Sequence, residues 1–221
     1  DSTALGWELP YQYELVHRLQ PACLIGNNHH QTPFEGEDIQ IFERDVPGEN
    51  KAGLSGQAIS RLPLETCQTM NGMWGYKVAD QNYKSATELI RLLVQTSGKG
   101  ANLLLNIGPQ PDGTLPETAL SRLSEIGQWL SSNGEAIYGT TSGGYIDPEK
   151  IVTTRKGDKL YIHIIDESVE HLEIPLEEKV KSVISFADHT PLQHKMRDGK
   201  LTLDVTVPAN TPDYIIEVTL L

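Results

Sequence analysis

The stretch SATELIRLLVQTSGKGANLLLNIGP, residues 85–109, decides the fold of this chain. Ser85 and Glu88 precede an apolar run with the spacing of a capping box, in which each side chain bonds a backbone N–H at the other's position. Two glycines then favour the end of a helix. Residues 102–107 follow as a short apolar strand that stops at a Gly-Pro pair. A helix followed at once by a buried strand predicts a parallel sheet of the α/β class.

Similar units flank this stretch on both sides. Residues 10–19 carry apolar side chains at helical spacing, and a proline ends that helix before a predicted buried strand at residues 22–25. Downstream, Thr114 and Glu117 repeat the capping-box spacing ahead of leucines and isoleucine on one helical face. The order of these units predicts a barrel-like α/β region over residues 1–143.

The sequence period changes after Gly143. Residues 159–165 and 200–207 alternate apolar with polar side chains, as half-buried strands do. Paired Gly and Asp residues supply turn signals between the strand candidates. About six short strands fit into this stretch, which predicts a small antiparallel β-sandwich at residues 144–221. The predicted fold class is therefore α/β followed by all-β.

The composition excludes some classes of function. With 18 basic and 30 acidic residues the net charge is −12, so no basic surface is available to bind nucleic acid or an anionic membrane. No apolar run reaches the roughly 18 to 20 residues that span a bilayer. The N-terminus lacks the pattern of a signal peptide, and a start at Asp1 predicts a processed, trimmed or split chain. Cys23 and Cys67 form no CxxC motif, which disfavours a zinc or redox site.

A long irregular stretch, residues 27–70, is the place to look for chemistry, because such stretches inside compact domains are usually functional. A short strand is expected at residues 38–42, and active sites of parallel α/β folds lie where strands end. Glu43 follows that strand beside Phe42. A carboxyl group against apolar surface has a raised pKa, as a general acid requires. The alternative is a surface ion pair of Glu43 with Arg44 or with another surface cation.

The histidines of the same stretch have three interpretations. His29 and His30 could bind a metal, cap backbone groups at a strand end, or hydrogen-bond a polyhydroxylated substrate. Adjacent strand residues point to opposite sides, which disfavours chelation of one metal by both. Trp74 is expected either to stack on a sugar ring or to belong to the core. Glu65, in an apolar segment, could equally be a structural carboxylate paired with a neighbouring element.

The remaining acidic residues of this stretch lie close together in the sequence. Glu35, Glu37 and Asp38 form a cluster that is most simply explained as a solvated loop.

Several short segments, taken in order, resemble glycoside hydrolase family 29, the retaining α-L-fucosidases. Those that carry the resemblance are Trp74-Gly-Tyr76, Tyr83-Lys-Ser85, Leu89-Ile90, Leu92-Leu93, Asn102-Leu-Leu-Leu-Asn-Ile-Gly-Pro109, Asp112-Gly113, Gly127-Gln-Trp-Leu130 and Asn133-Gly-Glu-Ala-Ile-Tyr-Gly-Thr140. The resemblance implies the C-terminal half of a (β/α)8-like (TIM) barrel followed by the β-sandwich. It also implies a fucosylated glycan as substrate, no cofactor, no metal, and a periplasmic or secreted location.

The family resemblance also implies a two-step mechanism that this chain cannot complete alone. An Asp nucleophile forms a covalent glycosyl-enzyme, and a second carboxyl group acts first as acid and then as base. In relatives the nucleophile lies in a Trp-Phe-Asp-Gly-like motif, which is absent here. Asp1 would fall a few residues downstream of it and is not assigned that role. We therefore expect a partner, the N-terminal half of the barrel from the same gene or a separate chain, to carry the nucleophile, and this chain alone to be inactive.

The resemblance assigns the remaining roles residue by residue. Residues 27–29 (Asn-Asn-His) occupy the place of an Asn-Asp-Arg-like tripeptide, and the acid/base Glu follows it at a strand end. Glu43 is therefore the expected acid/base, with Glu65 as second choice and as a supporting, substrate-binding residue. His29, which replaces the substrate-contacting Arg, and Trp74 are expected to contact fucose.

Two other hypotheses remain open beside the fucosidase. One is a non-catalytic module that binds fucose or other glycans and never needed a nucleophile. The other is a metal-dependent hydrolase that uses His29, His30 and nearby acids.

Overall fold

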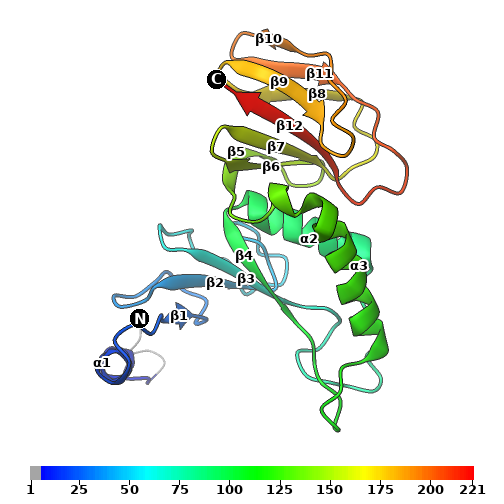
Figure 1. The fold of residues 1–221 in the computed structure, drawn as a ribbon. Helices are drawn as coiled ribbons and strands as arrows, with labels where there is room; N and C mark the ends of the chain where they lie inside the picture. Colours follow the sequence, from blue (N-terminus) through cyan, green and yellow to red (C-terminus); the bar gives the residue numbers. More distant parts are fainter. Residues whose placement is uncertain (1–5) are drawn as a thin grey trace. The chain divides into compact units, whose positions relative to one another are not determined.

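The structure is a computed structural model that describes residues 6–221 (Figure 1). Asp1 lies outside the described residues. The chain divides into two compact units. The first extends to Gln68 and includes Ala101–Leu105, and the second consists of Thr69–Gly100 and Asn106–Leu221. Within residues 6–221 no helix has the length and apolar character needed to cross a bilayer.

The first unit is built around a four-stranded sheet with the strand order β1-β2-β3-β4. Strands β1 and β2 are parallel, as are β2 and β3. The unit begins with a helix that has Pro10 in its first turn, where the missing N–H costs little. The elements are α1 (Leu9–Leu19), β1 (Gly26–Asn27), β2 (Ile39–Glu43), β3 (Leu64–Thr69) and β4 (Ala101–Asn106).

The two faces of β2 have different surroundings. Gln40 and Phe42 on one face are fully buried. The loop between β2 and β3 covers this face, because the Gln40 amide donates to the Ala58 carbonyl at 2.8 Å and accepts from the Ser60 N–H at 2.8 Å. On the opposite face the last residue, Glu43, is only partly buried. The sheet therefore presents one covered face and one more open face that ends in a carboxylate.

The prediction of a buried strand at residues 22–25 is wrong. Leu24 is 66% exposed, and pairing with β2 begins only at Gly26, opposite Ile39. Asp38 explains the difference, since its carboxylate accepts from the Ile25 N–H at 2.8 Å and its N–H donates to the Ile25 carbonyl at 2.7 Å. These bonds fix a turn-like contact in place of a strand ladder. The expected strand at residues 38–42 is confirmed within one residue by β2.

The expected half of a TIM barrel is not shown by this sheet. Four strands are present in it and they form no closed barrel within residues 6–221. The coarser expectation, an α/β region followed by an all-β region, is observed.

The second unit begins with helix α2 (Ala86–Gly98), and its predicted capping box is confirmed. The Ser85 hydroxyl accepts from the Glu88 N–H at 3.2 Å, and the Glu88 carboxylate accepts from the Ser85 N–H at 2.7 Å. The bond from the Ser85 N–H to the Glu88 carboxylate, and then the bond from the Ser85 hydroxyl to the same oxygen, lower the pKa of Glu88. Local sequence alone therefore determines where this helix begins.

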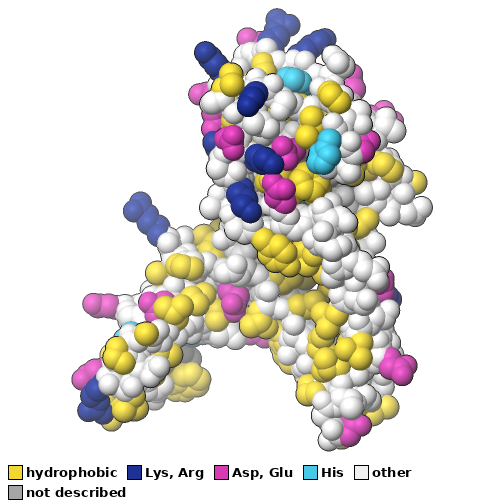
Figure 2. Space-filling view, viewed as in Figure 1, with side chains coloured by type: hydrophobic (Ala, Val, Ile, Leu, Met, Phe, Trp, Pro, Cys, Tyr) yellow, Lys and Arg dark blue, Asp and Glu magenta, His cyan; other side chains and the backbone are white. Residues whose placement is uncertain are grey.

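Helix α3 (Glu117–Asn133) begins without the predicted capping box. Pro116 is its N-cap and makes no side-chain cap bond. The Thr114 hydroxyl is engaged elsewhere, because it donates to Asp112 at 2.7 Å in a tight turn. The expected apolar stripe is also only partly buried, since Leu120 and Leu123 are 48% and 39% exposed. Apolar side chains are visible at the surface near this helix (Figure 2).

The β-sandwich prediction is confirmed, with eight strands where about six were expected. A short 3-10 helix, η1 (Gly134–Ala136), precedes it. The five-stranded sheet has the order β5 (Thr141–Asp147), β6 (Ile151–Lys156), β7 (Lys159–Ile164), β12 (Tyr214–Leu220) and β9 (Val180–Ser185), and the three-stranded sheet β10 (Lys195–Arg197), β11 (Lys200–Asp204) and β8 (His171–Pro175).

The two sheets are antiparallel and share one core. Ile162 and Ile216 from the larger sheet and Leu172 and Leu201 from the smaller one are fully buried in a single apolar cluster. Burying the apolar faces of both sheets against each other is what defines a sandwich. The domain boundary at residue 143 stays a prediction.

Candidate functional site

Glu43 is the last residue of β2, at the carboxyl end of a parallel strand. This is the edge at which active sites of parallel α/β folds are built. Its side chain is 16% exposed. Asn28 Nδ2 donates to its Oε2 at 3.2 Å, and His30 Nε2 lies 3.5 Å from the same oxygen. The carboxylate is thus oriented by two polar side chains from the loop that follows β1, and it still reaches solvent.

Glu65 shares the sheet face of Glu43 but lies deeper. Paired residues of parallel strands point to the same side, and the pairs are Ile41 with Glu65 and Glu43 with Cys67. Glu65 is therefore two residues, about 7 Å, further from the carboxyl edge than Glu43. Burial, and then the negative charges of both glutamates, raise the pKa of the Cys67 thiol.

Glu37 is the centre of a buried hydrogen-bond network, so the solvated-loop prediction is wrong for this residue. Its side chain is fully buried. It accepts from the Tyr13 hydroxyl at 2.7 Å, from Asn27 Nδ2 at 2.8 Å and from the Phe34 N–H at 2.9 Å, and it lies 2.8 Å from His29 Nε2. Its neighbour Glu35 is exposed, as expected.

These contacts change the acidity of the groups involved. Burial alone would raise the pKa of Glu37, but the bonds from Tyr13, Asn27, the Phe34 N–H and His29 outweigh it and hold the pKa below its usual value. Burial, and then the bond to Glu37, raise the pKa of the Tyr13 hydroxyl. Glu37 is therefore an anion whose charge the surrounding donors stabilise.

His29 is held from several sides. Its Nε2 contacts Glu37, its Nδ1 accepts from the Gln31 N–H at 3.2 Å, and its ring stacks on Phe34 with centroids 4.3 Å apart. Because both ring nitrogens have partners and the side chain is only 8% exposed, His29 is placed to shape the loop. Its neighbour His30 has a 33% exposed side chain beside Glu43. The two histidines contact different carboxylates, and no group of three potential metal ligands occurs among the described residues.

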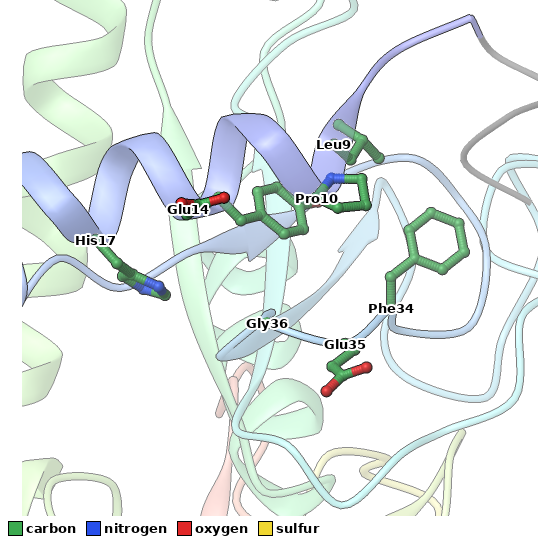
Figure 3. A pocket seen from close by; sticks show the side chains of 8 residues that line it. Leu9, Pro10, Glu14, His17, Phe34, Glu35 and Gly36 are labelled. Carbon is green, nitrogen blue, oxygen red and sulfur yellow. The ribbon is translucent and has the colours of Figure 1, made fainter.

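A cleft of about 510 Å³ adjoins this network in the first unit. Helix α1 forms one wall through Pro10 and His17, and Phe34 stands on the loop opposite (Figure 3). Tyr13 lines the cleft and bonds Glu37, so α1 and the His29 loop are joined through one carboxylate. Gly36, with φ of +92°, lets the loop approach the Tyr13 ring, which would lie 3.3 Å from an added Cβ.

Glu37→Gln is expected to destabilise the intact protein by about 1 to 3 kcal/mol near neutral pH, because it puts an amide donor among existing donors. The pKa of Glu37 is lowered on folding, so its stabilising effect exists above the ordinary Glu pKa of about 4.3 and disappears as the pH falls through the lowered value. Urea unfolding of both proteins, near neutral pH and again below the lowered pKa of Glu37, checks this. Exposed Glu35→Gln is the control and should change nothing, and a pH-independent difference would contradict the network.

Trp74 belongs to the second unit, where its backbone is firmly held. Asn106 Nδ2, at the end of β4, donates to the Trp74 carbonyl at 2.7 Å. A Cβ on Gly108 would lie 2.4 Å from the Tyr76 nitrogen, so only glycine permits this close approach. Thr69 Oγ1 donates to the Met73 carbonyl at 2.8 Å. The Trp74 side chain is half-buried, and its contact with a sugar stays a prediction.

The structure brings Glu43, Glu65 and Cys67 to one sheet face, and it gives contacts to residues whose roles the sequence left open. Asn28 and His30 contact Glu43, and Glu37 orients His29. The signal for Glu37 was weak, since one carboxylate within an acidic loop does not differ from its neighbours in sequence.

A family model described as Alpha-L-fucosidase matches residues 2–135, well over half of the chain. The chain belongs to the α-L-fucosidase family. Two curated members are the alpha-L-fucosidase of Dictyostelium discoideum, 47% identical over 79 residues, and the human tissue alpha-L-fucosidase, 38% identical over 130 residues. These matches cover 35% and 54% of this chain but only 17% and 28% of the relatives.

Solved fucosidase structures match almost the whole chain. Alpha-L-fucosidase isoenzyme 1 from Paenibacillus thiaminolyticus superposes with a TM-score of 0.79 at 29% identity, covering 98% of this chain and 54% of that one. The Thermotoga maritima α-fucosidase in complex with a mechanism-based inhibitor gives 0.72 at 25% identity, covering 96% and 49%. This member of the family thus spans about half the length of the fucosidase structures it matches.

Proposed function

We propose that this chain carries the acid/base half of the catalytic site of a retaining α-L-fucosidase, with Glu43 as the acid/base. The observation that carries the proposal is the position of Glu43 at the carboxyl end of a parallel strand, partly exposed and contacted by Asn28 and His30. Family membership supports the reaction class. The substrate would be a glycan with terminal α-L-fucose.

In this mechanism Glu43 first donates a proton to the oxygen of the leaving group and later removes one from the attacking water. Asn28 and His30 would hold the carboxyl group in the orientation that both steps need. His29, fixed by Glu37, would shape the loop that meets the sugar, and Trp74 would offer an indole face to the fucose ring. Glu65 is proposed as a supporting residue below Glu43, because it lies deeper on the same face.

The nucleophilic aspartate is proposed to lie outside these residues. Retaining glycosidases place their two carboxyl groups roughly 5 to 5.5 Å apart, so the segment that carries the nucleophile must meet the sheet close to Glu43. We propose that this segment is the N-terminal half of a (β/α)8-like barrel, from the same gene or from a separate chain. This segment would continue the four-stranded sheet of the first unit.

The 221-residue chain alone is expected to show no turnover of an aryl α-L-fucoside, because one carboxyl group cannot perform both steps. Adding or co-expressing the N-terminal segment should restore turnover. The measurement is phenol-release kinetics with each part alone and with both together. Turnover by the chain alone would overturn the division of the catalytic pair.

A further inference from the structure

A second cleft lies within the second unit, and none of the residues assigned above lines it. Its volume is about 450 Å³. Trp129 and Asn133 of α3 line one part, and Thr206, Pro212 and Asp213 from the segment before β12 line another. Trp129 also packs against the apolar cluster beneath it, so its ring is held in place by the core.

The carboxylate of Asp213 is the unusual group in this cleft. Its side chain is fully buried, and His163 Nδ1 lies 2.7 Å from its Oδ2. Its Oδ1 is also buried and has no hydrogen-bond partner within residues 6–221. A buried carboxylate oxygen without a donor is costly. Asp213 is one of the lining residues, but its side chain is 0% exposed, so a ligand hydroxyl reaches Oδ1 only if the wall of the cleft shifts.

The other lining groups define the chemistry of the ligand. Asp188 and Asp213 line the cleft and no Lys or Arg does, which disfavours an anion. Thr206, Thr211 and Asn133 add neutral hydrogen-bonding groups, and Trp129 adds a flat apolar surface. An aromatic ring beside hydroxyl, amide and carboxylate groups suits a sugar, which has apolar ring faces and a rim of hydroxyls.

We propose that this cleft binds a neutral saccharide, in addition to the fucose of the catalytic site. The ligand class is a hexose or N-acetylhexosamine unit of a glycan, with its ring against Trp129 and its hydroxyls bonded to the neutral polar groups of the lining.

The test uses N-acetyllactosamine, a neutral disaccharide without fucose, and the intact protein. Saturation-transfer NMR is expected to detect binding. Thr206→Trp, an exposed position on the cleft rim, should fill the space and weaken binding about tenfold or more. Exposed Thr118→Trp on α3, outside the cleft lining, is the matched control and should bind like the wild type. Turnover of an aryl fucoside should be the same in all three.

Three results would overturn the proposal. The first is no binding by the wild type, and the second is binding that Thr206→Trp leaves unchanged. The third is binding abolished by a chelator, which would assign the acidic residues of the lining to a cation. Because N-acetyllactosamine carries no fucose, each of these results leaves the proposed fucosidase activity untouched, and loss of aryl fucoside turnover in Glu43 variants is a separate measurement.

Discussion

Glu43→Ala is expected to lower kcat/KM of the intact enzyme about 10²- to 10⁴-fold on fucosides with poor leaving groups. Such substrates need a proton on the departing oxygen. A good leaving group, such as a dinitrophenolate, departs from the fucoside without that proton. Formation of the glycosyl-enzyme from such a substrate should therefore be nearly unaffected. Its hydrolysis still needs a base, so kcat should fall and KM should fall with it as the intermediate accumulates.

Azide provides the second readout for the same variant. It needs no general base, so it should react with the accumulated glycosyl-enzyme and restore turnover of the activated substrate. The product should be α-L-fucosyl azide, with retained configuration, because attack occurs on the covalent intermediate. A β-configured azide would mean that the altered residue was the nucleophile.

Glu65→Ala is the matched control, since Glu65 is a glutamate on the same sheet face about 7 Å from the carboxyl edge. It is expected to lower activity on good and poor leaving groups by the same factor and to show no response to azide. If Glu65→Ala shows the leaving-group dependence and Glu43→Ala does not, the roles are exchanged. If neither shows it, the acid/base lies elsewhere.

Features encoded within a few neighbouring residues were predictable from the sequence. The start of α2 follows from Ser85 and Glu88, which bond each other's backbone N–H groups three residues apart. The β-sandwich follows from alternation, which holds for β11, where Leu201 and Leu203 are buried. It fails for β7, which is buried on both faces, since Tyr161 is as buried as Ile162. The position of Glu43 at a strand end follows from the short apolar run before it.

Features that depend on distant partners were not predictable. Glu37 is a buried anion because Tyr13, 24 residues away, donates to it. Thr114 has the correct spacing for a cap, but its hydroxyl bonds Asp112 in a competing local turn. Residues 22–25 are apolar enough for a strand, yet Asp38 captures the backbone at Ile25. The bonds at Glu37 and Ile25 come from residues 24 and 13 positions away, whereas the Thr114 hydroxyl forms a local turn bond in place of the cap. Spacing in the sequence alone does not identify any of these partners.

The second large prediction concerns a row of buried, hydrogen-bonded polar groups in the sandwich. Thr154 Oγ1 donates to the Ala136 carbonyl at 2.7 Å, so its only hydroxyl proton is used. His163 Nε2, 3.0 Å from the same oxygen, must therefore be the donor in that contact. His163 Nδ1 also shares a hydrogen bond with Asp213 Oδ2, and the two atoms lie 2.7 Å apart. The imidazole thus links η1, β6 and β7 to the carboxylate before β12.

His163→Leu is expected to destabilise the intact protein by about 3 kcal/mol or more, measured by urea or thermal unfolding. Leucine fills most of the space of the imidazole, so the cost arises from the carboxylate of Asp213, which would lose its remaining partner in the described structure. His171 with Asp204 provides the control. That pair has the same 2.7 Å separation, but its side chains are 60% and 91% exposed, so water replaces the lost contact.

His171→Leu should therefore leave the unfolding midpoint nearly unchanged. Equal losses in the two variants would mean that the His–Asp distance, and not burial, sets the contribution of such a pair. No loss in His163→Leu would mean that the Asp213 carboxylate finds a donor without the histidine. Since Asp213 also lines the second cleft, the expected large loss would show that the cleft's carboxylate is kept in place by the fold before any ligand binds.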